Sequence, residues 1–155
     1  MIEQAAAVDV RPWRSPDRLD DIMAMVHASF VEFTPPSGVL KETAADLAQR
    51  QRDGVVLVAM AGDAFVGSVF CARKGDALYL TRMATHPAWR RRGIGTALMR
   101  AAEAEARAAG LPKLLLRVRK TLPGNLAYFS KFGFAVVGEG QEGGRTPFDV
   151  MERTL

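Results

Sequence analysis

Apolar side chains recur along the chain with two periods, one typical of helices and one typical of strands. Leu19, Ile22 and Val26 follow helical spacing, which predicts a helix over residues 16–30. A weaker pattern of the same period predicts a second helix over residues 41–52. The apolar side of the first helix is expected to face a core.

Residues that start and stop helices support both predictions. Ser15, Pro16 and Asp17 are typical of a helix N-terminus, with a capping side chain, a proline at the first helical position and an acid in the first turn. Prolines and glycine within residues 34–38 interrupt the pattern, and Gly54 ends the second helix. We therefore expect the first helix to begin at Pro16.

Three apolar runs with strand character follow these helices. They cover residues 55–61, 64–73 and 77–85, and Gly-Asp dipeptides at 62–63 and 75–76 separate them. Such dipeptides are typical of hairpin turns. The three runs therefore predict an antiparallel meander.

The second half of the chain alternates helix and strand patterns. An alanine-rich stretch over residues 93–109, ended by Gly110, predicts a long helix. A strand after this helix implies a right-handed parallel crossover from the meander. The other expected elements are strands at 8–11, 114–118, 134–137 and 148–155 and a short helix at 124–132. We expect one mixed α/β domain over residues 1–155.

Composition excludes several classes of protein. Apolar residues make up 48% of the 155 residues, which is ordinary for a globular domain. The net charge of +4 suits a small polyanion but is too low to indicate nucleic-acid binding. Cys71 is the only cysteine, which excludes an intrachain disulfide, favours a reducing compartment and predicts a buried structural thiol. Without a signal-peptide pattern or a long apolar run, we expect a cytoplasmic protein that does not bind membranes.

The segment between the third strand and the long helix is the strongest indication of a ligand site. It contains Arg90, Arg91 and Arg92, followed by Gly93 and Gly95. Glycine lets the backbone approach a ligand closely, and the N–H groups of a first helical turn are free to bind an anion. The helix dipole contributes about 0.3–1 kcal/mol for an anion at an exposed helix end. This turn is therefore predicted to bind phosphate.

The glycine pattern fits neither of two common nucleotide-binding motifs. A dinucleotide-binding turn has a third glycine where this chain has Leu98, and the Gly-Lys-Ser/Thr end of a triphosphatase loop is absent. A nucleic-acid surface would need more basic or aromatic companions than Arg117, Arg119 and Lys120. A surface helix that starts with glycine behind solvated arginines stays the alternative.

Two motifs in this order resemble those of the GNAT superfamily of acyl-CoA-dependent N-acetyltransferases. Residues 83–87 (Met-Ala-Thr-His-Pro) with residues 90–96 are similar to the family's acetyl-CoA signature. Residues 125–134 are similar to its later motif, which contains an aromatic residue and ends in Gly-Phe. The resemblance covers residues 8–155. It implies the family's fold, a meander followed by a parallel crossover, with two central strands that splay apart.

The resemblance also implies where acetyl-CoA binds as cosubstrate. Backbone N–H groups of residues 91–96 would hold the pyrophosphate, and the pantetheine arm would pair with the splayed strand, whose backbone would also hold the oxyanion. The implied cofactor-binding residues are Met83, Ala84, Thr85, Arg90, Arg91, Arg92, Gly93, Ile94, Gly95, Thr96 and Asn125. For Asn125, contact with the pantetheine and capping of the short helix both stay open.

The sequence departs from the family pattern at both proton-transfer positions. Many members have a tyrosine as general acid where this chain has Phe129, and some have a glutamate as general base where it has Arg117. Tyr128 is the candidate acid, although it points about 100° away from its neighbour around a helix. Packing beside Phe129 is its alternative role. Glu32 is the candidate base, and Asp149 or a chain of water molecules is the alternative.

The resemblance implies direct transfer of an acetyl group to a primary amine of a small molecule or a peptide. A catalytically weak acyl-CoA-binding sensor is the alternative, because of both departures. No cluster of histidine and acidic residues has metal-ligand spacing, so no metal is expected. Dimerisation through the last strands is common in the family, and a homodimer is an expectation on that ground.

The acceptor amine is the part of the function that the sequence predicts least well. The resemblance implies that residues 30–40 and 138–148 shape its site. Glu139 and Glu142 favour a cationic amine, whereas Arg145 favours a carboxylate. The charges in this segment therefore do not indicate a single class of acceptor.

Overall fold

A seven-stranded mixed sheet forms the centre of the structure, with strand order β1-β2-β3-β4-β5-β7-β6. The computed structural model describes residues 8–33 and 36–155. The strands are β1 (Val8–Pro12), β2 (Val55–Ala61), β3 (Ala64–Lys74), β4 (Ala77–Thr85), β5 (Lys113–Arg119), β6 (Ala135–Glu142) and β7 (Thr146–Thr154). The helices are α1 (Leu19–Phe30), α2 (Ala44–Asp53), α3 (Ile94–Ala108) and α4 (Pro123–Lys131), with 3-10 helices η1 (Gly38–Lys41) and η2 (Pro87–Trp89). The mixed α/β prediction is confirmed.

Strands β2 to β4 form the predicted antiparallel meander, and β1 pairs antiparallel with β2 at its outer edge. Gly62 lies in the turn between β2 and β3, and Gly75 lies in the turn between β3 and β4. Their φ angles are 59° and 62°, in the left-handed region that glycine adopts without strain. The two dipeptide turns therefore fix the strand order, as expected from the sequence.

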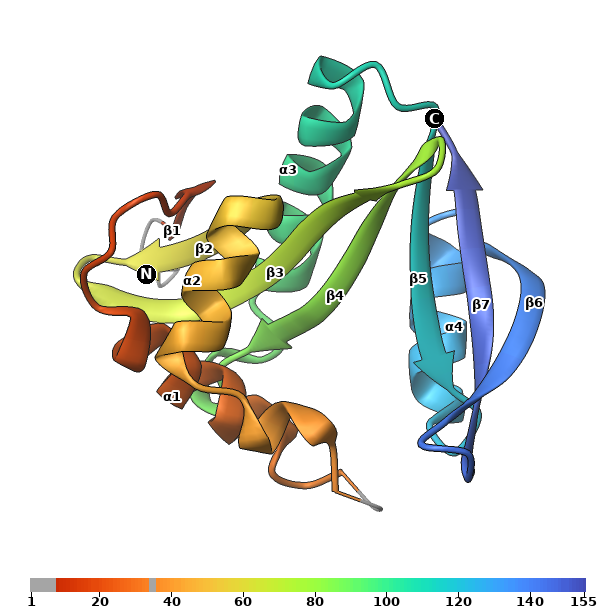
Figure 1. Cartoon of the computed structure of the whole chain (residues 1–155), viewed down its shortest axis with the longest axis horizontal. Coiled ribbons are helices and arrows are strands. Elements are labelled where there is room, and N and C mark those ends of the chain that lie inside the picture. Colours follow the sequence, from red (N-terminus) through yellow and green to blue (C-terminus); the bar gives the residue numbers. More distant parts are fainter. Residues whose placement is uncertain (1–7, 34–35) are drawn as a thin grey trace, which may run out of the picture.

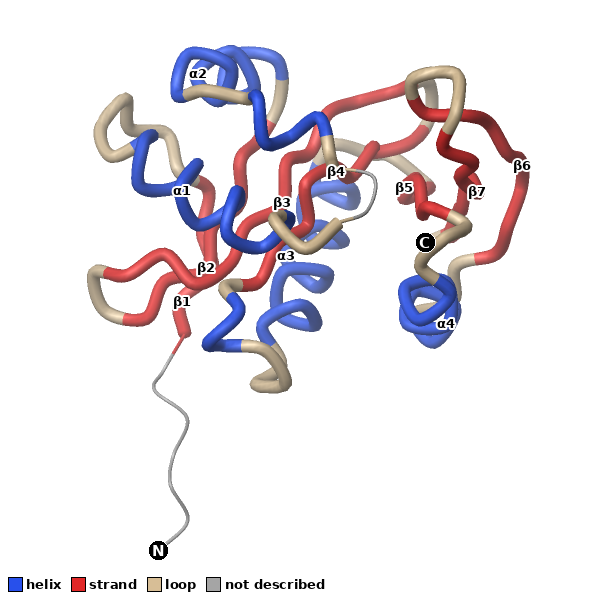
Figure 2. Tube along the Cα trace, turned by 90° about the horizontal axis from the view of Figure 1, so that it is seen from below, coloured by secondary structure: helices blue, strands red, loops and turns tan. Residues whose placement is uncertain are grey.

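Helices cover both faces of this meander (Figure 1). α1 and α2 pack on one face, where Ile22, Val26 and Leu47 are almost fully buried. α3 packs on the other face through Leu98 and Met99, and Figure 2 shows the sheet between the two helix layers. Burial of one such side chain contributes about 1.5–3 kcal/mol, so both cores fix the helices on the sheet. Across the described residues, no helix is long and apolar enough to cross a membrane.

The start of α1 differs from the predicted one. The helix begins at Leu19 rather than Pro16, because Arg18 has a left-handed conformation with a φ of 60°. The Ser15 hydroxyl accepts a hydrogen bond from the Asp17 N–H (3.0 Å). It closes a local turn instead of capping the helix, a competition that is common for serine.

α2 also begins later than predicted, at Ala44. Thr43 and Asp46 form a capping box, in which each side chain accepts a hydrogen bond from the other residue's backbone N–H. The Asp46 carboxylate accepts at 2.8 Å and the Thr43 hydroxyl at 3.4 Å. The start of the predicted helix, residue 41, instead ends η1.

β4 and β5 pair in parallel only over their first residues. The pairing ends at Tyr79 of β4 and Leu115 of β5. Beyond this point β4 stays with β3 while β5 stays with β7, so the two central strands diverge (Figure 1). The predicted parallel crossover and splayed central strands are confirmed.

β4 is irregular where it leaves β5. Arg82 has a positive φ of 54°, and the register between β3 and β4 shifts between Ser68 and Phe70. This is a β-bulge, which bends the strand and redirects its backbone groups. A left-handed non-glycine residue costs roughly 1–2 kcal/mol, so surrounding contacts must hold Arg82 there.

The C-terminal strands are longer than predicted. β6 continues past residue 137 to Glu142, and β7 begins at Thr146 and lies between β5 and β6. β6 is an edge strand, and nearly all of its residues are exposed. Its polar residues, such as Glu139 and Gln141, therefore leave no alternating apolar pattern in the sequence.

Candidate functional site

Two adjoining cavities lie between the diverging halves of the sheet. One cavity of about 650 Å³, the α3 cavity, lies beside the N-terminus of α3, and another of about 440 Å³, the fork cavity, lies where β4 and β5 separate. The residues common to both linings are Phe30, Phe33, Met83, Asn125 and Phe129. They form a junction through which one long ligand can reach both cavities.

The N-terminus of α3 forms one wall of the α3 cavity. Gly93 precedes the helix with a φ of 77°. The first hydrogen bond of the helix runs from the Ala97 N–H to the Gly93 carbonyl (3.0 Å), and no side chain caps this terminus. The N–H groups of Ile94, Gly95 and Thr96 therefore have no partner within the helix. Together with the helix dipole, they are suited to bind an anion.

The three arginines before α3 have different surroundings. Arg90 pairs with the exposed carboxylate of Glu32 (2.8 Å). Arg91 lines the α3 cavity and has a left-handed backbone with a φ of 65°. Arg92 stacks over the ring of Trp89 (4.7 Å) and lies outside the lining. Arg90 and Arg91 are therefore the arginines that face a ligand in this cavity.

Tyr128 of α4 contacts the first turn of α3. Its hydroxyl occupies the space that a Cβ on Gly95 would need, and it forms a hydrogen bond with the Thr96 side chain. Phe129 and Phe132 pack edge-on against its ring, each with a centroid distance of 5.2 Å. Burial raises the pKa of Tyr128, and the hydrogen bond with Thr96 only partly opposes this effect. The phenol is thus protonated at neutral pH and can donate a hydrogen bond beside the helix N-terminus.

Met83, Ala84 and Thr85 form the β4 wall of the α3 cavity. β5 no longer pairs with β4 along this wall, so the strand presents a backbone edge to the cavity. The Thr85 carbonyl is already engaged, because it accepts a hydrogen bond from the Ser29 hydroxyl (2.9 Å). An extended chain that carries amides can add to such an edge as a strand does.

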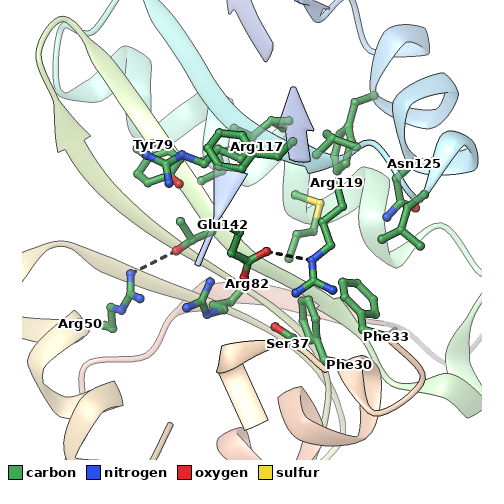
Figure 3. Close-up of a pocket in the computed structure, with 18 residues that line it drawn as sticks. Phe30, Phe33, Ser37, Arg50, Tyr79, Arg82, Arg117, Arg119, Asn125 and Glu142 are labelled. Atoms are coloured by element: carbon green, nitrogen blue, oxygen red, sulfur yellow. Dashed lines mark hydrogen bonds and ion pairs between the residues drawn. The ribbon is translucent and has the colours of Figure 1, made fainter. Parts of the chain in front are cut away.

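Arginines and aromatic rings line the fork cavity (Figure 3). The arginines are Arg50, Arg82, Arg117 and Arg119. The aromatic side chains are Phe30, Phe33, Tyr79, Phe129 and Phe148. Glu142 is the single acid among the described lining residues, so the cavity is cationic with apolar walls. Across the described residues, no group of three or more histidine, cysteine or acidic side chains is arranged to hold a metal ion.

Glu42 holds two of these arginines from behind the cavity wall. Arg82 donates from Nε to Oε1 (2.9 Å) and from Nη2 to Oε2 (3.2 Å), which is a bidentate pair. Arg50 contacts the same Oε2 at 3.4 Å. His27 Nε2 lies 2.9 Å from the Glu42 carbonyl oxygen, so α1 also contacts this residue. Glu42 therefore ties α1 and α2 to the bulge of β4.

The two β5 arginines differ in their partners. Arg119 is buried and pairs with Glu142 (2.9 Å). The Arg117 guanidinium lies 4.8 Å from the ring centroid of Phe148 and 5.6 Å from that of Tyr79. In the part of the chain that the structure describes, Arg117 forms no ion pair with a carboxylate. Its exposed guanidinium is therefore flanked by aromatic rings at the wall of the cavity.

The structure brings the sequence-predicted site residues together in the α3 cavity, apart from Arg92. Those in its lining are Met83, Ala84, Thr85, Arg90, Arg91, Gly93, Ile94, Gly95, Thr96 and Asn125. The candidate acid Tyr128 and the candidate base Glu32 line the same cavity. The alternative base Asp149 is buried, pairs with Lys120 (3.0 Å) and lines neither cavity.

Sequence reasoning missed most of the fork cavity. Its arginines belong to α2, β4 and β5 and share no motif. One signal was present in β4, where Tyr79 and Thr81 alternate with Leu78 and Leu80. Alternation places the two polar side chains on one face of a strand, and both line the cavity.

A model of the acetyltransferase (GNAT) family matches residues 19–134. The match runs from α1 to the Gly-Phe before β6, and it contains every residue of the junction between the cavities. A search of curated protein sequences finds no match.

Solved structures share the fold at low sequence identity. The PaiA N-acetyltransferase of Thermoplasma acidophilum in complex with coenzyme A has a TM-score of 0.82 at 18% identity, over 96% of this chain and 99% of that chain. Ard1 of Thermoplasma volcanium has a TM-score of 0.82 at 19% identity, over 96% and 98%. The ribosomal-protein-S18-alanine N-acetyltransferase of Escherichia coli has a TM-score of 0.78 at 18% identity, over 96% and 94%. At these identities the likeness concerns the fold.

Proposed function

Because the chain belongs to the acetyltransferase (GNAT) family, we propose that it transfers an acetyl group from acetyl-CoA directly to a primary amine of a small molecule or a peptide. The observation that carries this proposal is the α3 cavity, which has an uncapped helix N-terminus at one end, an unpaired strand edge along its wall and five lining residues in common with the fork cavity. The fold neighbour PaiA was solved with coenzyme A, which supports coenzyme A as the ligand of the α3 cavity.

In this proposal the α3 cavity holds the phosphates of acetyl-CoA. The N–H groups of Ile94, Gly95 and Thr96 donate to the pyrophosphate, and Arg91 adds positive charge beside them. Hydrogen bonds to a charged group contribute about 1.5–3 kcal/mol each. Tyr128, which is protonated, supplies a further donor at the same end.

The pantetheine arm follows the β4 edge from the helix to the junction. Its amides pair with the exposed backbone near Met83 and Ala84, as an added strand would. Asn125 stands at the junction, and no side chain caps α4. The sequence left two roles open for Asn125, contact with the pantetheine and capping of the short helix. We therefore assign contact with the pantetheine.

The acetyl group then lies at the junction, where an amine from the fork cavity can reach it. The neutral amine nitrogen forms the new C–N bond, its proton leaves, and the C–S bond breaks as the tetrahedral intermediate collapses. The thiolate takes up a proton to give coenzyme A. We assign the oxyanion donor to the backbone N–H of Met83, beside the bulge at Arg82. Loss of one such donor typically slows turnover by a factor of about 10²–10³.

Proton transfer in this cleft is assigned to water. Phe129 lies at the junction but has no hydroxyl, and Tyr128 lies at the phosphate end, beside Gly95. Glu32 lies on the α3 side and is paired with Arg90. A general base contributes about 10²–10⁴-fold, so an indirect route suits an acceptor amine of low pKa.

The second candidate function is an acyl-CoA-binding sensor with little catalysis. The observation in its favour is the pair of residues at the proton-transfer positions, Phe129 and Arg117, neither of which is an acid or a base at neutral pH. Both functions need the same coenzyme A site, so turnover distinguishes them.

The test combines thiol release from acetyl-CoA over a panel of primary amines with calorimetric titration of acetyl-CoA. We expect binding and turnover on part of the panel, and more than about tenfold weaker binding in Gly95→Asp, because a carboxylate then faces the phosphates. Ala104→Asp places the same charge on an exposed position of α3 outside both linings and is the control. Unchanged affinity in Gly95→Asp contradicts the phosphate site, and tight binding without turnover on any amine favours the sensor.

A further inference from the structure

We propose that the acceptor amine carries an anionic group, and that Arg117 binds this group in the fork cavity. The inference rests on the proposed function, because it names the class of acceptor for the same cleft. It concerns the end of the cleft opposite the α3 N-terminus, where the fork cavity collects guanidinium groups.

The charge of the lining favours an anion over a second cation. Arg50, Arg82, Arg117 and Arg119 contribute to the wall, against one carboxylate from Glu142 among the described lining residues. An amine with further ammonium groups would meet like charges at these guanidinium groups, which is unfavourable. An amine with a carboxylate or phosphate group would meet opposite charges.

Arg117 is the arginine best placed to bind that group. Arg50 and Arg82 are engaged by Glu42, and Arg119 is engaged by Glu142. Arg117 instead lies over Phe148 and Tyr79, and no described carboxylate pairs with it. A guanidinium that contacts rings keeps N–H groups for an oxyanion, and its planar fork matches a carboxylate or phosphate in bidentate geometry.

The position of Arg117 separates the anion from the reacting amine. Tyr79, which Arg117 contacts, is the last β4 residue that pairs with β5, so both lie at the closed end of the fork. Met83 and Phe129 belong to the junction at the other end of the cavity. A ligand bound to Arg117 therefore extends its amine toward the acetyl group.

The size and walls of the cavity indicate a small molecule. A volume of about 440 Å³ lies within the usual range of small-molecule sites, ~300–1,000 Å³. Phe30, Phe33, Leu80 and Leu116 give the cavity apolar walls between its charged groups. An amino acid or an aminoalkyl phosphonate of similar size has the required amine, apolar body and anion.

The test uses matched amines on one skeleton with the complete chain and saturating coenzyme A or acetyl-CoA. L-Phenylalanine and L-leucine are compared with their carboxamides, with the corresponding aminophosphonic acids and with the amines that lack the acid group. We expect the anionic members to exceed the carboxamides by about tenfold or more in kcat/KM and in affinity for the coenzyme A complex, as expected for a charge-assisted pair. Comparison of the carboxylic with the phosphonic acids shows which oxyanion the site prefers.

Arg117→Gln should remove this preference and leave the carboxamides unchanged, and Arg117→Lys should retain part of it. Arg100→Gln removes one exposed arginine of α3 outside both cavities and should change nothing. The proposal would be overturned if carboxamides or polyamines had the same kcat/KM and affinity as the anionic amines. It would also be overturned if the preference for anionic amines survived Arg117→Gln. If no amine is acetylated, the transferase proposal fails, while Arg117-dependent binding of the anionic amines still supports the anion site and its absence refutes it.

Discussion

The hydroxyl of Tyr128 lies against Gly95, in the space that a Cβ at position 95 would occupy. Alanine is favoured over glycine in a helix by about 1 kcal/mol, but here its methyl group would displace the phenol from Thr96. With Tyr128→Phe the nearest atom of that ring is Cζ at 3.5 Å, an ordinary contact. We therefore expect Gly95→Ala to lower the melting temperature of the native chain and to raise it in the Tyr128→Phe background.

Thermal denaturation of the four proteins in this double-mutant cycle measures the coupling. Gly124→Ala is the control, because Gly124 lies in the first turn of α4 with open space around its α-carbon. It should have the same effect in both backgrounds. Equal effects of Gly95→Ala in both backgrounds would show that the phenol does not fill this space.

The second prediction concerns the kinetic role of Tyr128. We expect Tyr128→Phe to keep most of the turnover rate and to weaken acetyl-CoA binding by up to about tenfold, the loss of roughly one hydrogen bond. Because the pKa of Tyr128 is raised, the wild-type contribution should persist at neutral pH and decline only above the ordinary tyrosine pKa of about 10. Steady-state kinetics across pH provide the measurement. A roughly hundredfold slower turnover with unchanged affinity would instead identify Tyr128 as the acid.

The third prediction separates the two roles of Glu32. Its carboxylate is 61% exposed and pairs with Arg90 at the α3 cavity. Glu32→Gln removes a negative charge near the phosphates and releases Arg90, so we expect acetyl-CoA to bind about two- to tenfold more tightly at low salt. The turnover rate should change by less than about tenfold. Calorimetry at two salt concentrations tests the first statement, and a turnover rate that falls roughly a hundredfold or more would make Glu32 the base.

The fourth prediction compares two carboxylates that both form ion pairs. The Glu42 side chain is 18% exposed and holds Arg82 and Arg50, whereas Glu139 is 70% exposed and pairs with Lys120. We expect Glu42→Gln to lower the free energy of unfolding by about 1–3 kcal/mol, because a partly buried charged network loses its anion. Glu139→Gln should change it by less than about 0.5 kcal/mol.

Urea denaturation of both variants measures these differences. Glu42→Gln should also reduce kcat/KM for the acceptor more than it reduces affinity for acetyl-CoA, because Arg82 lines the fork cavity and not the α3 cavity. If Glu42→Gln and Glu139→Gln lowered the free energy of unfolding equally, Glu42 would not hold the bulge in place.

The fifth prediction is a pH dependence of stability from Cys71. Burial raises the pKa of this thiol to about 12, and the charge of Glu105 adds to the effect. The folded protein therefore binds the proton more tightly than the unfolded chain, whose thiol pKa is about 8.5. The contribution is complete below about pH 8 and is lost as pH rises toward about 12, with a limiting slope of about 1.4 kcal/mol per pH unit.

Urea unfolding of the native chain and of Cys71→Ala between about pH 7 and 10 measures this slope. The substitution shifts stability at every pH, but only the difference in slope reports the thiol. Parallel curves for the two proteins would contradict a raised pKa at Cys71.

Local signals in the sequence were sufficient for the start of α3. Gly93 follows the arginines directly and Gly95 comes two residues later, so the chemistry of one turn predicts a free helix N-terminus. The structure has this terminus, with Gly93 in a left-handed conformation and no side-chain cap. A feature formed by residues that are adjacent in sequence can be predicted without knowledge of the fold.

The bulge in β4 was not predictable in the same way. Arg82 lies in an apolar run that is typical of a regular strand. Its positive φ depends on the register with β3, and its carboxylate partner Glu42 is 40 residues away in sequence. Such long-range contacts override local propensity and leave no local pattern.

The acceptor segment shows why charges alone gave conflicting indications. Glu139, Glu142 and Arg145 are close in sequence, but only Glu142 lines the fork cavity. Glu139 pairs with Lys120 (2.7 Å), and Arg145 is exposed near the end of the β6–β7 hairpin. Alternation along β6 and the turn after it place these neighbouring charges in different surroundings, so their sum over the segment does not indicate the acceptor.

The junction between the cavities separates two sets of residues. In the proposed function, residues that hold the donor and residues that select the acceptor share only the five junction residues, Phe30, Phe33, Met83, Asn125 and Phe129. On this proposal, a substitution in the fork cavity away from the junction would change the acceptor without disturbing the coenzyme. Such an architecture lets substrate preference drift over evolutionary time while the chemistry of transfer is inherited intact.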